Sequence, residues 1–358
     1  MQTRPLNTAP DPGAIGPVAA FGPGRGPVIH LVCPLSKAFG GSERRAANYL
    51  ALLSAHADVT LWAEREPRGE FARLAFRRLD LASGSVPEGG TLVLVGVYIE
   101  RSHWLARARP ERLVIVHNTP EPDRLRRLLD FAARVGLPDP QLVFPSETHR
   151  ASTRLAGFVD WGSFDFEAFK PASGAPDRGR FAVGRLSRDE TYKHHPQDVR
   201  LYRHLAAVGM QVRLMGASVL RPRLRDGEAI EVLDTGQMAA VSFLQSLDAF
   251  IYRTGPDWSE PSGRVVVEAM ACGLPVVVGR NGGYRELIEH GTNGFLFDTH
   301  LEAIDYLEAL RSDPALARRI GRAARATAVE RFGDSHTARV REFFLRSDAT
   351  VPRGRTSP

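Results

Sequence analysis

The stretch EPSGRVVVEAMACGLPVVVGRNGGYRELIEHGTNGFLFD, residues 260–298, carries the clearest structural pattern in this chain. Its apolar run at 265–271 predicts a helix, which Gly273 ends. The run at 275–279 then predicts a buried strand, and 284–289 predicts a short second helix. Helices and strands that alternate in this way are typical of a parallel sheet with helices on its faces.

The same alternation extends through most of the chain. Short apolar runs predict further strands at 28–33, 59–63, 92–97, 113–117, 141–145, 180–184, 211–215, 229–233 and 249–252. Helical patterns lie at 43–54, where Ser42 is the expected N-cap, and at 124–134, 148–156, 302–311 and 314–331. We therefore predict an α/β protein with two Rossmann-like open parallel-sheet domains that face each other across a cleft.

Segments rich in Pro and Gly divide the chain. Residues 1–26 and 347–358 lack apolar periodicity and are predicted to be flexible tails. We expect an N-terminal domain at 27–165, a linker at 166–179 and a C-terminal domain at 180–346. The last helix of the C-terminal domain is a candidate for packing back on the N-terminal domain.

Composition indicates a soluble globular protein, with 43% hydrophobic and 25% charged residues among 358. The longest uncharged apolar stretch is too short to cross a bilayer, and the N-terminus lacks the pattern of a secretory signal. The two cysteines, Cys33 and Cys272, lie far apart among apolar neighbours. These features favour a reducing, cytoplasmic location.

The formal net charge is +6, and the basic residues are almost all arginine. Most of these arginines are expected to be solvated surface residues. Two clusters, at 101–112 and 124–134, are dense enough to attract an anionic acceptor or a membrane surface. Aromatic residues do not interleave with the arginines, so the sequence gives no indication of nucleic-acid binding.

Two carboxylates flank the start of the helix predicted at 265–271. Ser262 and Gly263 lie at the helix start, where backbone N–H groups and the helix dipole favour an anion. Glu260 precedes this start and Glu268 follows it, at a separation of about 10 Å for a helical rise. Since carboxylates accept hydrogen bonds from paired hydroxyls, the spacing suits a ligand with two sugars joined by a diphosphate.

A second group of polar residues follows the strand predicted at 180–184. Arg185 comes directly after this strand, and Lys193 lies eight residues further on. Two fixed cations at this place suit the charge that develops on a diphosphate leaving group. Arg188 is an alternative to Lys193, and a solvated basic loop is the other interpretation.

The string Glu260-x7-Glu268 with Ala-Met-Ala-x-Gly-x-Pro-Val-Val and Gly-Gly-x-x-Glu-x-Ile resembles the retaining glycosyltransferases of family 4, which have the GT-B fold. The resemblance spans most of 28–345 and is dense at 181–298. It implies that Glu260 faces the donor sugar near the reacting centre and that Glu268 binds the ribose. It also implies that Arg185 and Lys193 bind the diphosphate, and that the N-terminal domain binds the acceptor.

Further donor-binding residues follow from the same resemblance. Ser262, Gly263, Arg264 and Val265 are expected to contribute backbone groups. Arg264 replaces a residue that is often aliphatic in the family, and its side chain is a candidate for an unusual phosphate or acceptor contact. Glu286 either contacts the donor or orients the loop at 281–283, or else it caps its own short helix.

In the N-terminal half, Gly40 and Gly41 match a family loop near the diphosphate, although an ordinary turn explains them too. His117, at the end of a predicted strand, matches a position that contacts the reacting sugar, or else is structural. Asn118 is its weaker companion, and Ser146 with Glu147 is treated as scaffold.

Metal binding is not expected. No two aspartates are separated by one residue, which is the arrangement that glycosyltransferases of the other large fold use to hold a divalent ion. No His/Cys cluster has metal-ligand spacing either. We therefore predict no cofactor and no metal, with a UDP- or GDP-linked sugar as substrate.

The expected function is retaining, metal-independent transfer of a sugar to a saccharide or lipid-linked acceptor, with possible peripheral contact at the inner membrane face. The alternatives are a non-catalytic glycosyltransferase-like binding subunit and another GT-B enzyme, such as a sugar-nucleotide epimerase or a phosphorylase. A dinucleotide-dependent oxidoreductase is disfavoured because no Gly-x-Gly-x-x-Gly follows the first strand.

Overall fold

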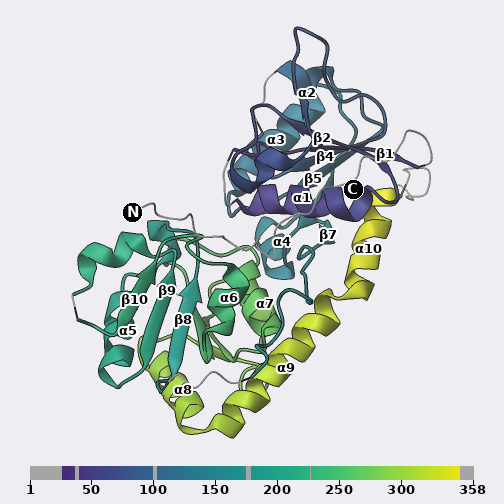
Figure 1. Cartoon of the computed structure of the whole chain (residues 1–358). Helices are drawn as coiled ribbons and strands as arrows, with labels where there is room; N and C mark the ends of the chain where they lie inside the picture. Colours follow the sequence, from purple (N-terminus) through teal and green to yellow (C-terminus); the bar gives the residue numbers. More distant parts are fainter. Residues whose placement is uncertain (1–25, 37–39, 100–102, 175–178, 226, 347–358) are drawn as a thin grey trace, which may run out of the picture.

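The computed structural model describes residues 26–36, 40–99, 103–174, 179–225 and 227–346. The tails predicted at 1–26 and 347–358 lie outside these ranges, apart from Gly26. Within them the chain forms two α/β domains, one above the other in Figure 1. All strand pairs in both sheets are parallel, which confirms the predicted fold class.

The N-terminal sheet has the strand order β3-β2-β1-β4-β5-β6-β7. Its strands are β1 (Val28–Val32), β2 (Asp58–Ala63), β3 (Arg77–Arg78), β4 (Thr91–Val95), β5 (Arg112–Val116), β6 (Gln141–Phe144) and β7 (Phe158–Val159). The helices of this half are α1 (Gly41–Leu53), the 3₁₀ helix η1 (Gly69–Arg73), α2 (His103–Arg107), α3 (Pro122–Arg134) and α4 (Glu147–Thr153). The central strands β4 and β5 are buried at every position, as expected for a parallel sheet covered on both faces.

The C-terminal sheet has the order β10-β9-β8-β11-β12-β13. Its strands are β8 (Ala182–Leu186), β9 (Gln211–Met215), β10 (Ile230–Leu233), β11 (Ala249–Tyr252), β12 (Val276–Gly279) and β13 (Phe295–Phe297). The α-helices are α5 (Asp198–Ala207), α6 (Ala240–Gln245), α7 (Arg264–Ala271), α8 (His300–Ser312), α9 (Pro314–Phe332) and α10 (Asp334–Leu345). The 3₁₀ helices are η2 (Thr191–Lys193), η3 (Ser218–Arg223) and η4 (Gly283–Leu287).

In both sheets the strand order reverses direction beside the first strand. The reversal lies between β1 and β4 in the N-terminal sheet and between β8 and β11 in the C-terminal sheet. Ligands of open parallel sheets bind outside the carboxyl ends of the strands at such a switch point. These two places therefore define where a ligand of each domain is expected.

Two local predictions were wrong. Ser42 does not cap α1, since Gly40 is the N-cap and the Ser42 hydroxyl bonds to Asn118 instead. Helix α4 ends earlier than predicted, because Arg154 adopts a left-handed conformation with φ 59°. Elements without a long apolar run, such as the two-residue strand β3 and the short helix α2, were not predicted.

The chain crosses between the domains twice. The first crossing follows β7, and the second leads from α9 to α10, which ends against the N-terminal domain in Figure 1. On α10, Phe343 stacks on Phe158 at 4.4 Å between ring centroids, and Phe344 packs on Tyr49 at 4.6 Å. The C-terminal helix is therefore part of the N-terminal core.

The two crossings also touch each other. Phe332, the last residue of α9, packs on Trp161 and Phe164 at centroid distances of 5.4 and 5.3 Å. The fully buried Asp160 accepts hydrogen bonds from Arg45 and Tyr49 of α1 and contacts His336 of α10. Although burial opposes ionisation, these partners hold the pKa of Asp160 at about 2.

In the ranges that the structure describes, no helix is both long enough and apolar enough to cross a membrane.

Candidate functional site

Helix α7 begins beside the switch point of the C-terminal sheet. Its N-cap, Gly263, has φ 80° and ψ 55°, a left-handed conformation that favours glycine. A Cβ at this position would also collide with the ring of Tyr284. Within the described part of the chain, no side chain caps this helix start. The first N–H groups of α7, from Gly263 to Val265, are thus suited to an anion.

The backbone of Glu260 is fixed by the glycine pair that follows β12. Gly283 N donates to Glu260 O at 2.8 Å, and Glu260 pairs with Gly282 in an isolated parallel bridge. Side chains at Gly282 and Gly283 would collide with Tyr284 and with the carbonyl of Pro261, respectively. The glycines are therefore needed for close packing behind Glu260.

Lys193 and Glu260 form an ion pair at the centre of the site. The Lys193 Nζ donates to Glu260 Oε2, which also accepts from the Tyr252 hydroxyl at 3.2 Å. The exposed fractions of the two side chains are 6% and 15%. Burial lowers the pKa of Lys193, whereas Lys193 and Tyr252 hold the pKa of Glu260 below its usual value despite burial. The pair places one cation and one anion at a partly enclosed position.

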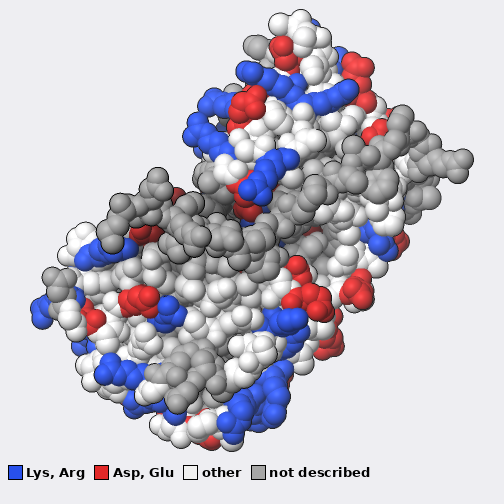
Figure 2. Space-filling view, in the orientation of Figure 1, with Lys and Arg blue, Asp and Glu red and all other residues white. Residues whose placement is uncertain are grey.

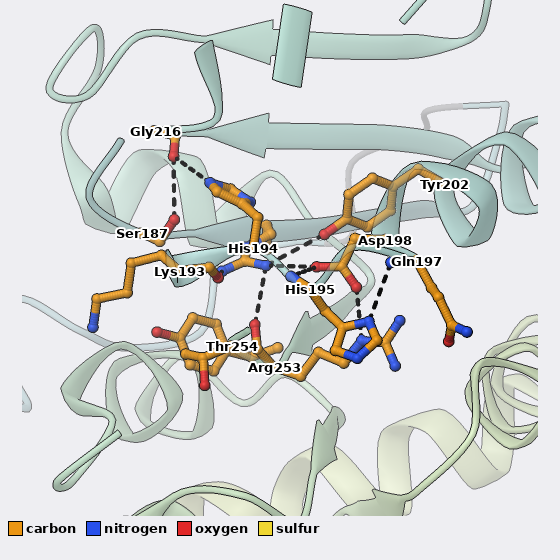
Figure 3. A network of polar contacts seen from close by, with 12 residues as sticks. Ser187, Lys193, His194, His195, Gln197, Asp198, Tyr202, Gly216, Arg253 and Thr254 are labelled. Carbon is orange, nitrogen blue, oxygen red and sulfur yellow. Dashed lines mark hydrogen bonds and ion pairs between the residues drawn. The ribbon is translucent and has the colours of Figure 1, made fainter. Parts of the chain in front are cut away.

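Arg185 lies behind this ion pair and is fully buried. Its Nη2 donates to the carbonyl of Lys193 at 2.6 Å, and its Nη1 donates to Asp198 at 3.2 Å and to the carbonyl of Arg253 at 3.1 Å. Figure 3 shows this network, with the Lys193 side chain extending away from it. The contacts of Arg185 hold the segment that carries Lys193, and its predicted diphosphate contact stays a prediction.

Asp198 and Arg253 complete the network and were missed in the sequence. Asp198 Oδ1 accepts from Arg253 Nε at 2.7 Å, while its Oδ2 also accepts from the backbone of His195 at 3.0 Å. Neither residue lies in a recognisable motif. Arg253 directly follows the apolar run at 249–252, whereas Asp198 stands among other polar residues, so its sequence surroundings do not set it apart.

Glu268 lies on α7 one turn after the helix start. Its Oε1 accepts from Arg264 Nε at 2.8 Å, and its side chain is 10% exposed. The structure therefore brings Arg264 and Glu268 together on α7, next to the backbone groups of Ser262 and Gly263 that precede the helix.

In the N-terminal domain, the start of α1 lies against the ends of β4 and β5. Gly40 is the N-cap of α1, and Gly41 is its first residue. The Ser42 hydroxyl bonds to the Asn118 side chain at about 3.2 Å, next to Gly96, where a Cβ would approach Ser42 closely. The predicted Gly-Gly loop and the strand end at Asn118 are thus neighbours.

His117 is fully buried at the carboxyl end of β5, where its ring packs against that of His149 at 4.8 Å between centroids. Among the described residues, neither ring nitrogen of His117 has a hydrogen-bond partner, and neither do His149 Nε2 and Thr119 Oγ1. Burial lowers the pKa of His117 to about 3, with a further contribution from His149, whose own pKa burial lowers to about 4. Buried unpaired polar atoms are costly, so this group is suited to receive hydroxyls of a ligand.

The two domains are bonded beside Glu260. The Ser146 hydroxyl donates to the carbonyl of Pro261 at 2.5 Å. The Glu286 carboxylate accepts from the backbone N–H groups of Glu147 and Thr148 at 3.2 and 3.0 Å. Glu286 thus caps α4 of the opposite domain, which neither interpretation of this residue had included.

The arginine clusters differ in exposure. On the face shown in Figure 2, Lys and Arg side chains gather over α2 and α3. Arg126 and Arg134 of α3 are exposed. Arg112 is instead buried, where it donates to Gln141 and to backbone carbonyls of α10, so its predicted surface role was wrong. Arg101 lies outside the described residues.

No group of three or more His, Cys, Asp or Glu side chains within the described ranges is arranged to hold a metal ion.

Comparison with known proteins gives matches concentrated in the C-terminal domain. Residues 229–327 match the family described as glycosyl transferases group 1. D-inositol 3-phosphate glycosyltransferase of Pseudarthrobacter chlorophenolicus is 46% identical over 87 residues, which cover 24% of this chain and 20% of the relative. Spore coat protein SA of Bacillus subtilis is 34% identical over 86 residues, 23% of each chain. The matched segment thus spans about a fifth to a quarter of the length of these two relatives.

Solved structures match over both domains. HepE of Anabaena, crystallised with UDP and glucose, has a TM-score of 0.67 at 20% identity over 88% of this chain and 99% of HepE. Sucrose-phosphate synthase of Thermosynechococcus elongatus has a TM-score of 0.64 at 14% identity, over 89% and 98% of the two chains. The fold is therefore that of the GT-B glycosyltransferases.

Proposed function

We propose that this protein is a retaining glycosyltransferase of the group 1 type, which transfers a sugar from a nucleotide-diphosphate sugar to an acceptor without a metal ion. The observation that carries the proposal is the Lys193–Glu260 ion pair beside the uncapped start of α7. Glu260, Glu268 and the start of α7 all lie in the segment that matches the family. The relationship to crystal structures with UDP and UDP-glucose favours a UDP-linked donor, with GDP as the alternative.

In this proposal the diphosphate lies at the start of α7, where the N–H groups of Gly263 to Val265 and the Lys193 ammonium stabilise its charge. Glu268 binds the ribose hydroxyls. Glu260 faces the donor sugar and stabilises the positive charge that develops on its ring. Arg185 keeps the Lys193 segment in place through the carbonyl of Lys193.

Retention of configuration is expected if the acceptor oxygen attacks the anomeric carbon on the same face from which the diphosphate departs. The acceptor oxygen forms a bond to the anomeric carbon while the bond from that carbon to the phosphate oxygen breaks. The acceptor proton passes to the departing phosphate oxygen, so the protein supplies no base. The neutral imidazole of His117 orients the sugar by hydrogen bonding, in agreement with its unpaired nitrogens.

The acceptor is proposed to bind in the N-terminal domain. A saccharide or a lipid-linked saccharide fits the neutral polar groups around His117 and Asn118. The exposed arginines of α3, such as Arg126 and Arg134, favour peripheral contact with an anionic membrane surface. A glycan, a glycolipid or a cell-surface polysaccharide is the product class.

A panel of UDP- and GDP-linked sugars tests the proposal, because a bound donor raises the apparent unfolding temperature. We expect one donor to stabilise the protein and to be hydrolysed slowly in EDTA, with release of the α-anomer, as NMR detects. Stabilisation without hydrolysis or transfer would favour the non-catalytic subunit. An inverted product, or loss of activity in EDTA, would contradict the mechanism.

A further inference from the structure

The Arg264 side chain makes contacts that neither the backbone role nor the phosphate or acceptor contact predicted for it explains. Its side chain is 31% exposed, and its guanidinium lies over the ring of Phe164 at 4.5 Å from the centroid. Nε donates to Glu268 Oε1 at 2.8 Å, and Nη1 donates to the carbonyl of Ser163, also at 2.8 Å. One side chain thus connects the helix of the donor site to the first crossing between the domains.

The Ser163 carbonyl, to which Arg264 Nη1 donates, is also bonded to the N-terminal domain. The Ser163 carbonyl also accepts from Asn48 Nδ2 of α1 at 3.3 Å. Three residues earlier in the chain, Asp160 bonds to α1 through Arg45 and Tyr49. Residues 160–163 are therefore held by α1, and Arg264 reaches them from the C-terminal domain.

The surroundings of the guanidinium favour a strong interaction with Glu268. Burial lowers the pKa of Arg264, Glu268 raises it, and Arg44 and Arg45 lower it further. The Glu268 carboxylate is the anion that offsets these nearby cations. Because Arg264 Nε occupies Oε1, the other carboxylate oxygen has a fixed direction.

We propose that Arg264 is a positioning residue that fixes the Glu268 carboxylate for the donor ribose and couples donor binding to the orientation of the two domains. This inference rests on the proposed function, since it takes Glu268 as the ribose ligand. A leucine at this position would keep the helix but would leave both the Glu268 carboxylate and the Ser163 carbonyl without this donor. A lysine would keep the charge, but it lacks the planar guanidinium with which arginine donates to the Glu268 carboxylate and to the Ser163 carbonyl at once.

The experiment measures donor affinity by calorimetry and steady-state kinetics with UDP-glucose and the other sugars of the panel. The variants are Arg264→Leu, Arg264→Lys and, as a matched control, Arg318→Leu on the exposed surface of α9. We expect Arg264→Leu to raise Kd and KM for the donor about tenfold, with kcat at saturation within about threefold of the wild-type value. The reason is that the lost charge-assisted hydrogen bond contributes mainly to donor binding. Arg264→Lys should give an intermediate value, and Arg318→Leu should match the wild type.

A double-mutant cycle with Glu268→Gln separates positioning from general damage. In the Glu268→Gln background, Arg264→Leu should change Kd by less than about twofold, because the pair acts as a unit. If Arg264→Leu changed the donor Kd equally in the wild-type and Glu268→Gln backgrounds, the inference would be overturned. It would also be overturned if the single variant unfolded at the wild-type temperature and its Kd were unchanged; neither result would affect the proposed function. A wild-type protein that binds no donor would instead contradict the proposed function, and the inference with it.

Discussion

The two domains present opposite kinds of polar groups at the ends of their central strands. In the C-terminal domain the groups are charged and paired, as Lys193 with Glu260 and Arg185 with Asp198. In the N-terminal domain the buried His117 is neutral, and among the described residues its ring nitrogens have no partner. Paired charges are able to stabilise a charge-separated transition state, whereas neutral groups with unused hydrogen-bonding capacity are suited to orienting hydroxyls.

From this difference we predict separate roles for the two halves of the proposed site. Stabilisation of the charge that develops during transfer should depend on the residues of the C-terminal domain, and the rate of transfer should fall steeply when they are changed. Orientation by the N-terminal residues should fail more gradually, because a hydroxyl that loses one partner can still bond to water.

The largest effect is expected for Glu260. Glu260→Gln keeps the side-chain volume but removes the charge, and Glu260→Ala removes both, which leaves Lys193 without its anion. We expect transfer to fall about a thousandfold or more in either variant. Measured kcat/KM should be compared with Glu167→Ala, whose side chain is 95% exposed. Full activity in a folded Glu260→Ala variant would refute the assignment.

Lys193 and Arg188 provide a matched pair of cations from one loop. Lys193→Met should lower kcat about a hundredfold, because the ammonium at the proposed diphosphate position is lost. Arg188→Met should lower kcat less than about threefold, since Arg188 bonds to the Tyr192 hydroxyl at 3.3 Å rather than to Glu260. Rapid-quench measurement of the chemical step would distinguish them, and the reverse order would make Arg188 the leaving-group cation.

The neutral state of His117 should appear as a pH dependence of stability. Its folded pKa of about 3 lies below the unfolded value of about 6.5, so the unfolded chain binds more protons between these values. The resulting stabilisation, of the order of a few kcal/mol, is complete above about pH 6.5 and is lost as the pH falls toward 3.

Thermal unfolding from pH 7.5 to 4.5 would measure this loss. His117→Phe should reduce the slope, whereas His204→Asn on the exposed side of α5 should not. Identical slopes for wild type and His117→Phe would show that His117 is not held neutral.

The smallest effect is expected at the contact between the domains. Glu286→Gln weakens the bonds to the N–H groups of Glu147 and Thr148, because the acceptor loses its charge. Transfer should fall two- to fivefold, with donor affinity nearly unchanged. Glu289→Gln, an exposed neighbour, is the control. A large loss of donor affinity in Glu286→Gln would favour a direct donor contact.

The sequence predicted the fold and the α7 region well because both depend on local patterns. Apolar runs mark the buried strands, and a glycine is needed at position 263 because a Cβ there would collide with the Tyr284 ring. Ser42 misled the prediction of the N-cap, since its hydroxyl has a partner, Asn118, that lies 76 residues away.

The residues that the sequence did not reveal act through distant partners. Asp198 pairs with Arg185 and Arg253, and Asp160 collects partners from α1 and α10. No spacing rule links such positions along the chain. Glu286 belonged to the recognised motif, but its bond to α4 depends on how the two domains meet.

The two crossings between the domains affect how freely the domains can change their relative orientation. Two chain segments pass between the domains at one place, where Phe332 touches Trp161 and Phe164. Two crossings that pack on each other restrain the orientation of the domains more than a single connecting segment would. Substitutions that remove the Phe332 ring should therefore loosen the relative orientation of the domains without altering any residue of the candidate site.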